Sequence, residues 1–252
     1  MPGKPHKSAL DRRSLLALGA GSIASTVIGS HVCVAEAPAT GEPARSPGHA
    51  LEGLKEGNAR FMSQPQVCAM DLAKQRAGVA GSQAPWATIL SCADSRVPAN
   101  EIVGLDPGEL FVHRNVANLA PPQDANYLSV LQFAVDVLKV KHIMVVGHYG
   151  CGGVSAAVDG RRRGLVDHWL HPIREIYYQN RVPLDAIADL SARLNRLCEL
   201  NVKRQVTNVA SDVFVQDAWA RGQALSVHGW VYSLADGLIK DLEVTVTGPR
   251  GG

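Results

Sequence analysis

Short apolar runs that end abruptly at polar residues alternate along the chain with stretches whose apolar residues recur at helical spacing. Runs at 86–92, 110–113 and 142–147 have the length and composition of buried strands. Residues 125–138 place apolar side chains on one helical face, and Asp124 precedes them as a candidate N-cap. The same reasoning predicts helices at 50–62, 152–158, 166–180, 186–209 and 212–221, and strands at 224–232 and 243–247. This alternation predicts an α/β fold with a mostly parallel central sheet flanked by helices.

Polar clusters follow the three predicted strands directly, where the chemistry of such sheets belongs. The first is Cys92-Ala-Asp94-Ser-Arg96, the second is His113-Arg114-Asn115, and the third is His148-Tyr-Gly-Cys151-Gly-Gly. A lone cysteine at a strand end is more often a small buried apolar residue than a ligand. Three clusters at equivalent positions favour a functional site at the carboxyl edge of the sheet.

Cys92, His148 and Cys151 are candidate ligands of one metal ion. His148 and Cys151 stand three residues apart at a strand-to-helix turn, and Cys92 follows a neighbouring strand. Two thiolates and one imidazole suit Zn²⁺, and three protein ligands with an open fourth position are typical of catalytic zinc. The alternatives are an unmetallated redox pair of thiols and two unrelated buried cysteines.

Asp94 and Arg96 are candidate catalytic residues. Asp94 stands two residues beyond Cys92, so its carboxylate can accept a hydrogen bond from water on the metal. Arg96 can pair with Asp94 through a forked contact and hold it off the metal. The alternative is an ion pair that only stabilises the turn.

Composition excludes several classes of protein. The chain has 252 residues, of which 46% are apolar and 19% charged, and its formal net charge is +2. The apolar share can fill a core, and the modest charged share argues against disorder. Near-neutral charge argues against a nucleic-acid partner. Arg161, Arg162 and Arg163 form a basic run without interleaved aromatic residues, which is typical of a solvated loop.

The first 39 residues are predicted to be an export signal. Residues 15–28 form an uncharged run that is too short to span a bilayer, and the Arg12-Arg13 pair directly precedes it. Paired arginines before a short apolar region resemble a twin-arginine signal, which predicts a periplasmic or exported protein. Cleavage is expected between 35 and 39, and an uncleaved tail or a membrane anchor is the alternative.

The rest of the chain divides simply. Residues 40–49, rich in Pro, Gly and Ala, are predicted to be a linker. Residues 50–252 show no internal repeat or low-complexity break and are predicted to be a single catalytic domain. Once the signal is removed, we expect no membrane association.

The motifs of this chain resemble those of the β-class carbonic anhydrases, and with the export signal they indicate a bacterial member. The resemblance covers about residues 50–248 and rests on four further stretches besides the first cluster. These are Phe111-Val-His-Arg114-Asn115-Val-Ala-Asn118, Gly147-His148-Tyr-Gly-Cys151-Gly152-Gly153, Trp219-Ala-Arg-Gly222, and His228-Gly-Trp-Val-Tyr232 with Asp236-Gly237.

The resemblance implies one zinc ion per subunit on Cys92, His148 and Cys151, an Asp94–Arg96 dyad, and reversible hydration of CO₂ to bicarbonate and a proton. In that mechanism zinc-bound hydroxide attacks CO₂. It also implies a homodimer or homotetramer in which the helix at 50–62 forms an N-terminal arm around the partner. Two alternatives stay open: a hydrolase of a CO₂-like molecule such as carbonyl sulfide or carbon disulfide, and a non-catalytic zinc-binding protein.

The resemblance also assigns a substrate pocket and a regulatory site. Gln83, Phe111 and Gly152 match the family's pocket positions, and Phe133 stands where Tyr is common. Some bacterial members have a closed state, in which the aspartate that matches Asp94 becomes the fourth zinc ligand. A bicarbonate site built from Trp, Arg and Tyr favours that closed state. Here Arg114 and Tyr232 match that site but Ile89 replaces the Trp, so we expect weak or absent inhibition by bicarbonate.

Other residues receive structural interpretations. His113, His142 and His228 lie in or beside apolar strands, where hydrogen-bonded structural roles are expected. Cys68 and Cys198 have no assigned role.

Overall fold

A five-stranded sheet forms the centre of the fold. The computed structural model describes residues 52–59 and 78–249. The strand order is β2-β1-β3-β4-β5. The first four strands run parallel and β5 is antiparallel to β4, which confirms the predicted α/β class with a mostly parallel sheet. The strands are β1 (Ala87–Cys92), β2 (Leu110–Asn115), β3 (His142–His148), β4 (Ser226–Tyr232) and β5 (Ile239–Asp241).

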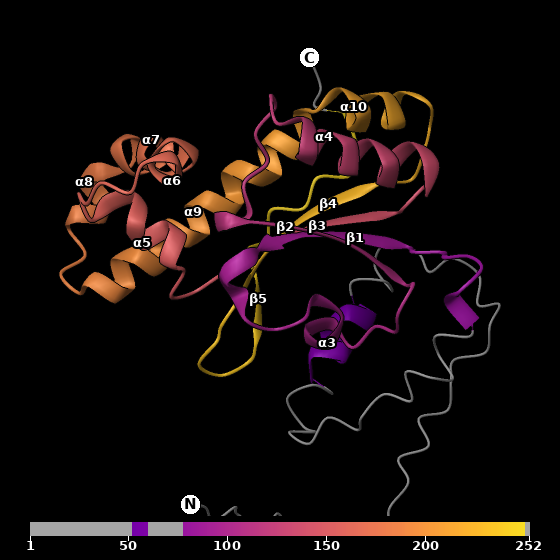
Figure 1. Ribbon diagram of the computed structural model, residues 1–252, viewed down its shortest axis with the longest axis horizontal. Helices are drawn as coiled ribbons and strands as arrows, with labels where there is room; N and C mark the ends of the chain where they lie inside the picture. Colours follow the sequence, from indigo (N-terminus) through magenta and orange to yellow (C-terminus); the bar gives the residue numbers. More distant parts are fainter. Residues whose placement is uncertain (1–51, 60–77, 250–252) are drawn as a thin grey trace, which may run out of the picture. The chain divides into compact units, whose positions relative to one another are not determined.

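Helices cover both faces of this sheet, so β1, β3 and β4 are buried along their whole length. Helices α4 (Ala125–Gln132), α9 (Leu190–Ser211) and α10 (Val213–Ala220) lie on one face, and α3 (Ala99–Val103) lies on the other (Figure 1). A helix at 52–59 packs on the α3 side, where Leu54 is buried with Ile102 and Val103. Strands buried on both faces explain their continuous apolar sequences.

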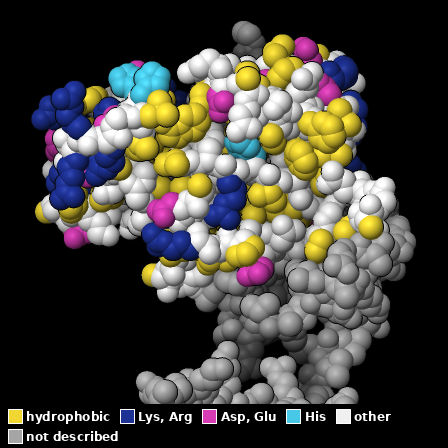
Figure 2. All heavy atoms as spheres, viewed as in Figure 1, with side chains coloured by type: hydrophobic (Ala, Val, Ile, Leu, Met, Phe, Trp, Pro, Cys, Tyr) yellow, Lys and Arg dark blue, Asp and Glu magenta, His cyan; other side chains and the backbone are white. Residues whose placement is uncertain are grey.

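A lobe of short helices follows β3. It consists of α5 (Gly152–Val158), α6 (Leu165–Trp169), α7 (His171–Gln179) and α8 (Arg181–Asp185). Its buried side chains form a cluster with Cys92 and Cys151, so the lobe covers that part of the carboxyl edge. Figure 2 shows Lys and Arg side chains gathered on this lobe. None of the helices within 52–59 and 78–249 is long and apolar enough to cross a membrane.

Several predicted elements differ from the structure. The helix predicted at 166–180 is two helices separated at Leu170, and Pro172 lies in the first turn of the second. Helix α8 was not predicted, and the next helix begins only at Leu190 because Asp189 caps it by accepting from the Ala192 amide.

The second half of the helix predicted at 125–138 also differs, because residues Phe133–Val137 form a wider π turn in which Leu138 donates to the Phe133 carbonyl. Asp124 does cap α4, by accepting from the Asn126 amide. The helix predicted at 50–62 is described for 52–59 only.

The strand predicted at 243–247 is wrong. The chain makes a single bridge there, between Val227 and Val246, and the fifth strand is instead β5. Glu243 has a φ of 56°, which is incompatible with extended backbone at the start of the predicted strand.

Candidate metal centre

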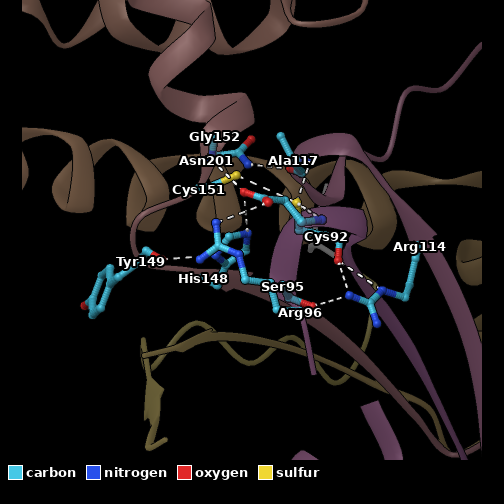
Figure 3. A network of polar contacts seen from close by, with 11 residues as sticks. Cys92, Ser95, Arg96, Arg114, Ala117, His148, Tyr149, Cys151, Gly152 and Asn201 are labelled. Carbon is cyan, nitrogen blue, oxygen red and sulfur yellow. Dashed lines mark hydrogen bonds and ion pairs between the residues drawn. The ribbon is translucent and has the colours of Figure 1, made fainter. Parts of the chain in front are cut away.

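The three predicted metal ligands meet at the carboxyl edge of the sheet. Cys92 is the last residue of β1, His148 is the last residue of the adjacent parallel β3, and Cys151 directly precedes α5. Their ligand atoms all lie within 4.8 Å of one another, and each residue is at most 4% exposed (Figure 3). Parallel pairing therefore brings together residues that are far apart in the chain.

The donor set fits a zinc ion. Tetrahedral coordination with Zn–S bonds of about 2.3 Å places two sulfur atoms roughly 3.8 Å apart. The sulfur atoms of Cys92 and Cys151 are 3.7 Å apart. His148 Nε2 is buried and has no hydrogen-bond partner within the described part of the chain. An unpaired buried nitrogen beside two thiols is the arrangement that a metal ion would complete.

The backbone fixes which nitrogen of His148 is free to bind. Nδ1 lies 3.0 Å from the carbonyl oxygen of Tyr149. Because that oxygen can only accept, Nδ1 carries the proton and Nε2 keeps its lone pair on the side of the thiols. Tyr149 is itself held, since its amide donates to the Tyr232 carbonyl and its hydroxyl donates to Glu199.

The surroundings of Cys92 favour a thiolate. The hydrogen bond with the Cys151 thiol lowers the pKa of Cys92, with further contributions from His148 and from the amides of Asp94 and Ala117. The same hydrogen bond, together with burial, raises the pKa of Cys151. Two adjacent thiols therefore do not both ionise readily, and a divalent cation between them would remove that penalty.

Asp94 lies beside the ligands but is tied to other donors. Its Oδ2 accepts from the Gly152 amide at 2.8 Å and lies 3.9 Å from His148 Nε2. Its Oδ1 accepts from Arg96 at 3.3 Å, which confirms that the two side chains pair. Arg96 has a left-handed backbone with a φ of 63° at the end of the short turn Ala93–Ser95. The turn is thus shaped so that Arg96 reaches back to Asp94.

Arg114 braces this turn from β2. Its guanidinium donates twice to the Cys92 carbonyl and once each to the Val97 carbonyl and the Ser95 hydroxyl. Tyr232 is 3% exposed and its carbonyl accepts from Tyr149.

The predicted pocket residues are only partly brought together. Gly152 lies at the metal centre through its amide. Phe111 and Phe133 stack on each other with ring centroids 5.7 Å apart, and Phe133 is 44% exposed. Gln83 is exposed in the segment before β1. The pocket assignment of these residues stays a prediction.

Sequence reasoning missed the residues of α9 that support the site. Glu199 accepts from Tyr149 and Asn201 donates to the Ala117 carbonyl. Both are polar residues on the buried side of a helix otherwise rich in buried valines. That pattern was readable in the sequence, but their partners lie 50 and 84 residues away.

The other singled-out residues have structural surroundings. His142 and His228 are buried against each other, and His113 lies 3.3 Å from the Asn115 amide. Cys198 is buried, and burial raises its pKa to about 12, so its thiol stays protonated and unreactive. Cys68 lies outside the described residues.

Comparisons with known proteins agree on one family. The profile of the family described as "Carbonic anhydrase" matches residues 87–239. A carbonic anhydrase of Emericella nidulans is 48% identical over 170 residues, which cover 68% of this chain and 75% of that protein.

Solved structures give the same result. The Coccomyxa β-carbonic anhydrase, determined with acetazolamide, superimposes with a TM-score of 0.67 at 39% identity, over 80% of this chain and 93% of that one. A tetrameric β-carbonic anhydrase of Sordaria macrospora superimposes with a TM-score of 0.64 at 36% identity, over 79% of this chain and all of that one.

Proposed function

Because this chain belongs to the β-class carbonic anhydrases, we propose that Cys92, His148 and Cys151 hold zinc and that Asp94 orients the attacking water. The reaction is the reversible hydration of carbon dioxide to bicarbonate and a proton. When bound, zinc supplies the Lewis acidity that makes water nucleophilic at neutral pH. The chain's own residues hold the metal and supply Asp94, which can accept a hydrogen bond from the attacking water.

Asp94 is suited to orient the nucleophile because its carboxylate is fixed from both sides. The Gly152 amide holds Oδ2 and Arg96 holds Oδ1, and the carboxylate still lies within 4 Å of the His148 ligand atom. A carboxylate acceptor beside the water orients a lone pair toward the carbon of CO₂. The Arg96 side chain is largely exposed, so its ion pair with Asp94 adds little to stability, and we propose that its role is to orient the Asp94 carboxylate.

The proximity of Asp94 Oδ2 to the Cys92–His148–Cys151 cluster is the observation that carries this proposal. The test combines metal analysis with stopped-flow CO₂ hydration for wild type, Cys92→Ala and Asp94→Asn. We expect Cys92→Ala to lose zinc and activity, and Asp94→Asn to keep zinc but lose about a hundredfold in kcat/KM.

Asp136→Asn is the matched control, because Asp136 is an ion-paired carboxylate in the π turn that follows α4. It should hydrate CO₂ at the wild-type rate. Bound zinc with full activity in Asp94→Asn would show that Asp94 does not orient the nucleophile.

We further propose that the subunits form a homodimer or homotetramer, as the Sordaria structures are described as tetrameric. The edge strand β2 supports this, because Val112 is 41% exposed on it. Phe133, which stacks on Phe111 of the same strand, is also exposed, as is Val137. Light scattering at micromolar concentration tests the assembly, and a monomer would contradict it.

Export of the protein is also a proposal. It rests on Arg12-Arg13 before the uncharged residues 15–28. We expect a bacterial host to cleave the chain between 35 and 39 and to deliver the product to the periplasm. Fractionation of wild type and an Arg12→Lys, Arg13→Lys variant tests the signal, and unprocessed wild-type protein in the cytoplasm would refute it.

A further inference from the structure

Helix α9 presents a ladder of buried amide side chains to the segment that follows β2. Asn201, Gln205 and Asn208 stand at spacings of four and three residues, so they share one face of the helix. Asn201 and Gln205 are each only 1% exposed. Together the three side chains bond the backbone of residues 117–120 at three atoms: the Ala117 carbonyl, the Ala120 amide and the Ala120 carbonyl.

The segment they hold is strained. Ala117 has a φ of 66° and Asn118 a φ of 47°, a left-handed conformation that residues with a side chain rarely adopt. Ala117 is fully buried, so hydrogen bonds to water do not compensate for the energetic cost of its left-handed backbone. Strained backbone persists only where its surroundings enforce it, and it gathers at functional sites.

The hydrogen bonds of the ladder fix the orientation of each amide. The Ala120 amide can only donate, so the Gln205 group that faces it at 3.0 Å must be its oxygen. Gln205 Nε2 then donates to Asn201 Oδ1 at 2.9 Å, which leaves Asn201 Nδ2 to donate to the Ala117 carbonyl at 2.9 Å. The ladder thus aims one donor at the strained residue.

Ala117 links this ladder to the metal centre. Its amide donates to the Cys92 sulfur at 3.1 Å, as Figure 3 shows together with Asn201. A change of φ at Ala117 rotates its amide N–H relative to the rest of the residue. Relaxation of this left-handed conformation would therefore turn the N–H away from the Cys92 sulfur. We propose that Asn201 is a positioning residue, which holds Ala117 in its strained conformation and thereby keeps a hydrogen bond on the Cys92 ligand. The inference rests on the proposed zinc site.

The test is the zinc affinity of Asn201→Ala, measured by competition with a chromophoric chelator at pH 7.5. We expect a loss of about tenfold or more, because removal of a residue that supports a hydrogen bond to a metal ligand has that effect in known metal sites. Asn195→Ala, an amide lost from the same helix outside the ladder, should bind zinc as wild type does.

A spectrum separates positioning from mere stability. In the cobalt-substituted proteins, the thiolate-to-metal bands should shift in Asn201→Ala and remain unchanged in Asn195→Ala. A lower urea midpoint for Asn201→Ala with unchanged zinc affinity and unchanged cobalt bands would overturn the proposal. If Asn201→Ala fails to fold, Gln205→Met, which removes the group that orients Asn201, should show the same spectral shift with a smaller loss of affinity.

Rescue gives the sharpest outcome. Ala117→Gly keeps the amide donor and removes the penalty on left-handed backbone. We expect the Ala117→Gly, Asn201→Ala double variant to recover part of the lost affinity, and no recovery would overturn the proposal. If wild type hydrates CO₂ and binds zinc, and Asn201→Ala binds zinc with the same affinity, only this inference is refuted. Failure of wild type to bind zinc would refute the zinc site as well.

Discussion

The buried pair His142–His228 should make the fold sensitive to acid. His142 Nδ1 lies 3.1 Å from His228 Nε2, and His228 Nδ1 lies 3.0 Å from the Thr245 hydroxyl. Both imidazoles are at most 2% exposed. Burial lowers the pKa of His142 to about 4, with smaller effects from His228 and Lys141.

Burial also lowers the pKa of His228 to about 4, where Asp241 opposes the shift and Lys55 adds to it. Both rings are therefore neutral in the folded protein at pH 5, whereas their ordinary value of 6.5 makes them charged in the unfolded chain. The unfolded state then binds more protons, so stability decreases as pH falls from 6.5 toward 4. From pH 7 to pH 5, each histidine should lower the free energy of unfolding by about 2 kcal/mol.

His228→Gln tests this value, because glutamine can still bond His142 and Thr245 but does not titrate. Urea unfolding followed by tryptophan fluorescence at pH 7, 6 and 5 gives the free energy of unfolding of each protein. The two proteins have the same metal site, so the difference between their pH profiles comes from His228 and from its smaller effect on His142. That difference should change by about 2 kcal/mol from pH 7 to pH 5 in favour of the variant. Profiles parallel within about 0.5 kcal/mol would refute the reasoning.

Three further predictions concern packing, charge and regulation. A methyl group on Gly57 would lie 1.9 Å from the Val103 carbonyl oxygen, so Gly57→Ala should lower the free energy of unfolding by about 3 kcal/mol in urea titrations. Gly81→Ala, with nothing within 4 Å, is its control and should be near neutral. Burial alone would raise the pKa of Glu199, but its hydrogen bonds from Lys240, Tyr149 and Arg196 lower it to about 2. Glu199→Gln should therefore cost about 2 kcal/mol at pH 7, and in urea titrations this difference should vanish as pH falls from 4.5 toward 2. Finally, because Ile89 is buried in the core where a tryptophan would be needed, CO₂ hydration at pH 7.5 and fixed ionic strength should show no steep cooperative inhibition by bicarbonate.

The cluster of candidate ligands was predictable because each of its members follows a recognisable feature. Cys92 and His148 end continuous apolar runs, and Cys151 lies in the turn before a helix. In a parallel sheet such positions meet at one edge whatever the loops between them do. The position of Asp94 and Arg96 beside this cluster was predictable for the same reason, since they are carried on the turn that Cys92 begins.

The supporting residues were not predictable from spacing. Asn201 bonds Ala117 across 84 positions, and Glu199 bonds Tyr149 across 50. Their roles depend on where α9 crosses the sheet, which is set by packing of its valine side chains against β3 and β4. Element boundaries failed where a local turn overrode the apolar pattern, as at Leu170 and Glu243.

The sequence by itself therefore determined the class of fold, the family and the candidate set of metal ligands, because these depend on periodicity and on short motifs. Only the tertiary structure decided how these residues are arranged: which nitrogen of His148 is free, what holds Asp94, and which side chain bonds Ala117. The physical reason is distance along the chain. Hydrogen bonds between side chains and backbone atoms many residues apart exist only after the helices have packed on the sheet.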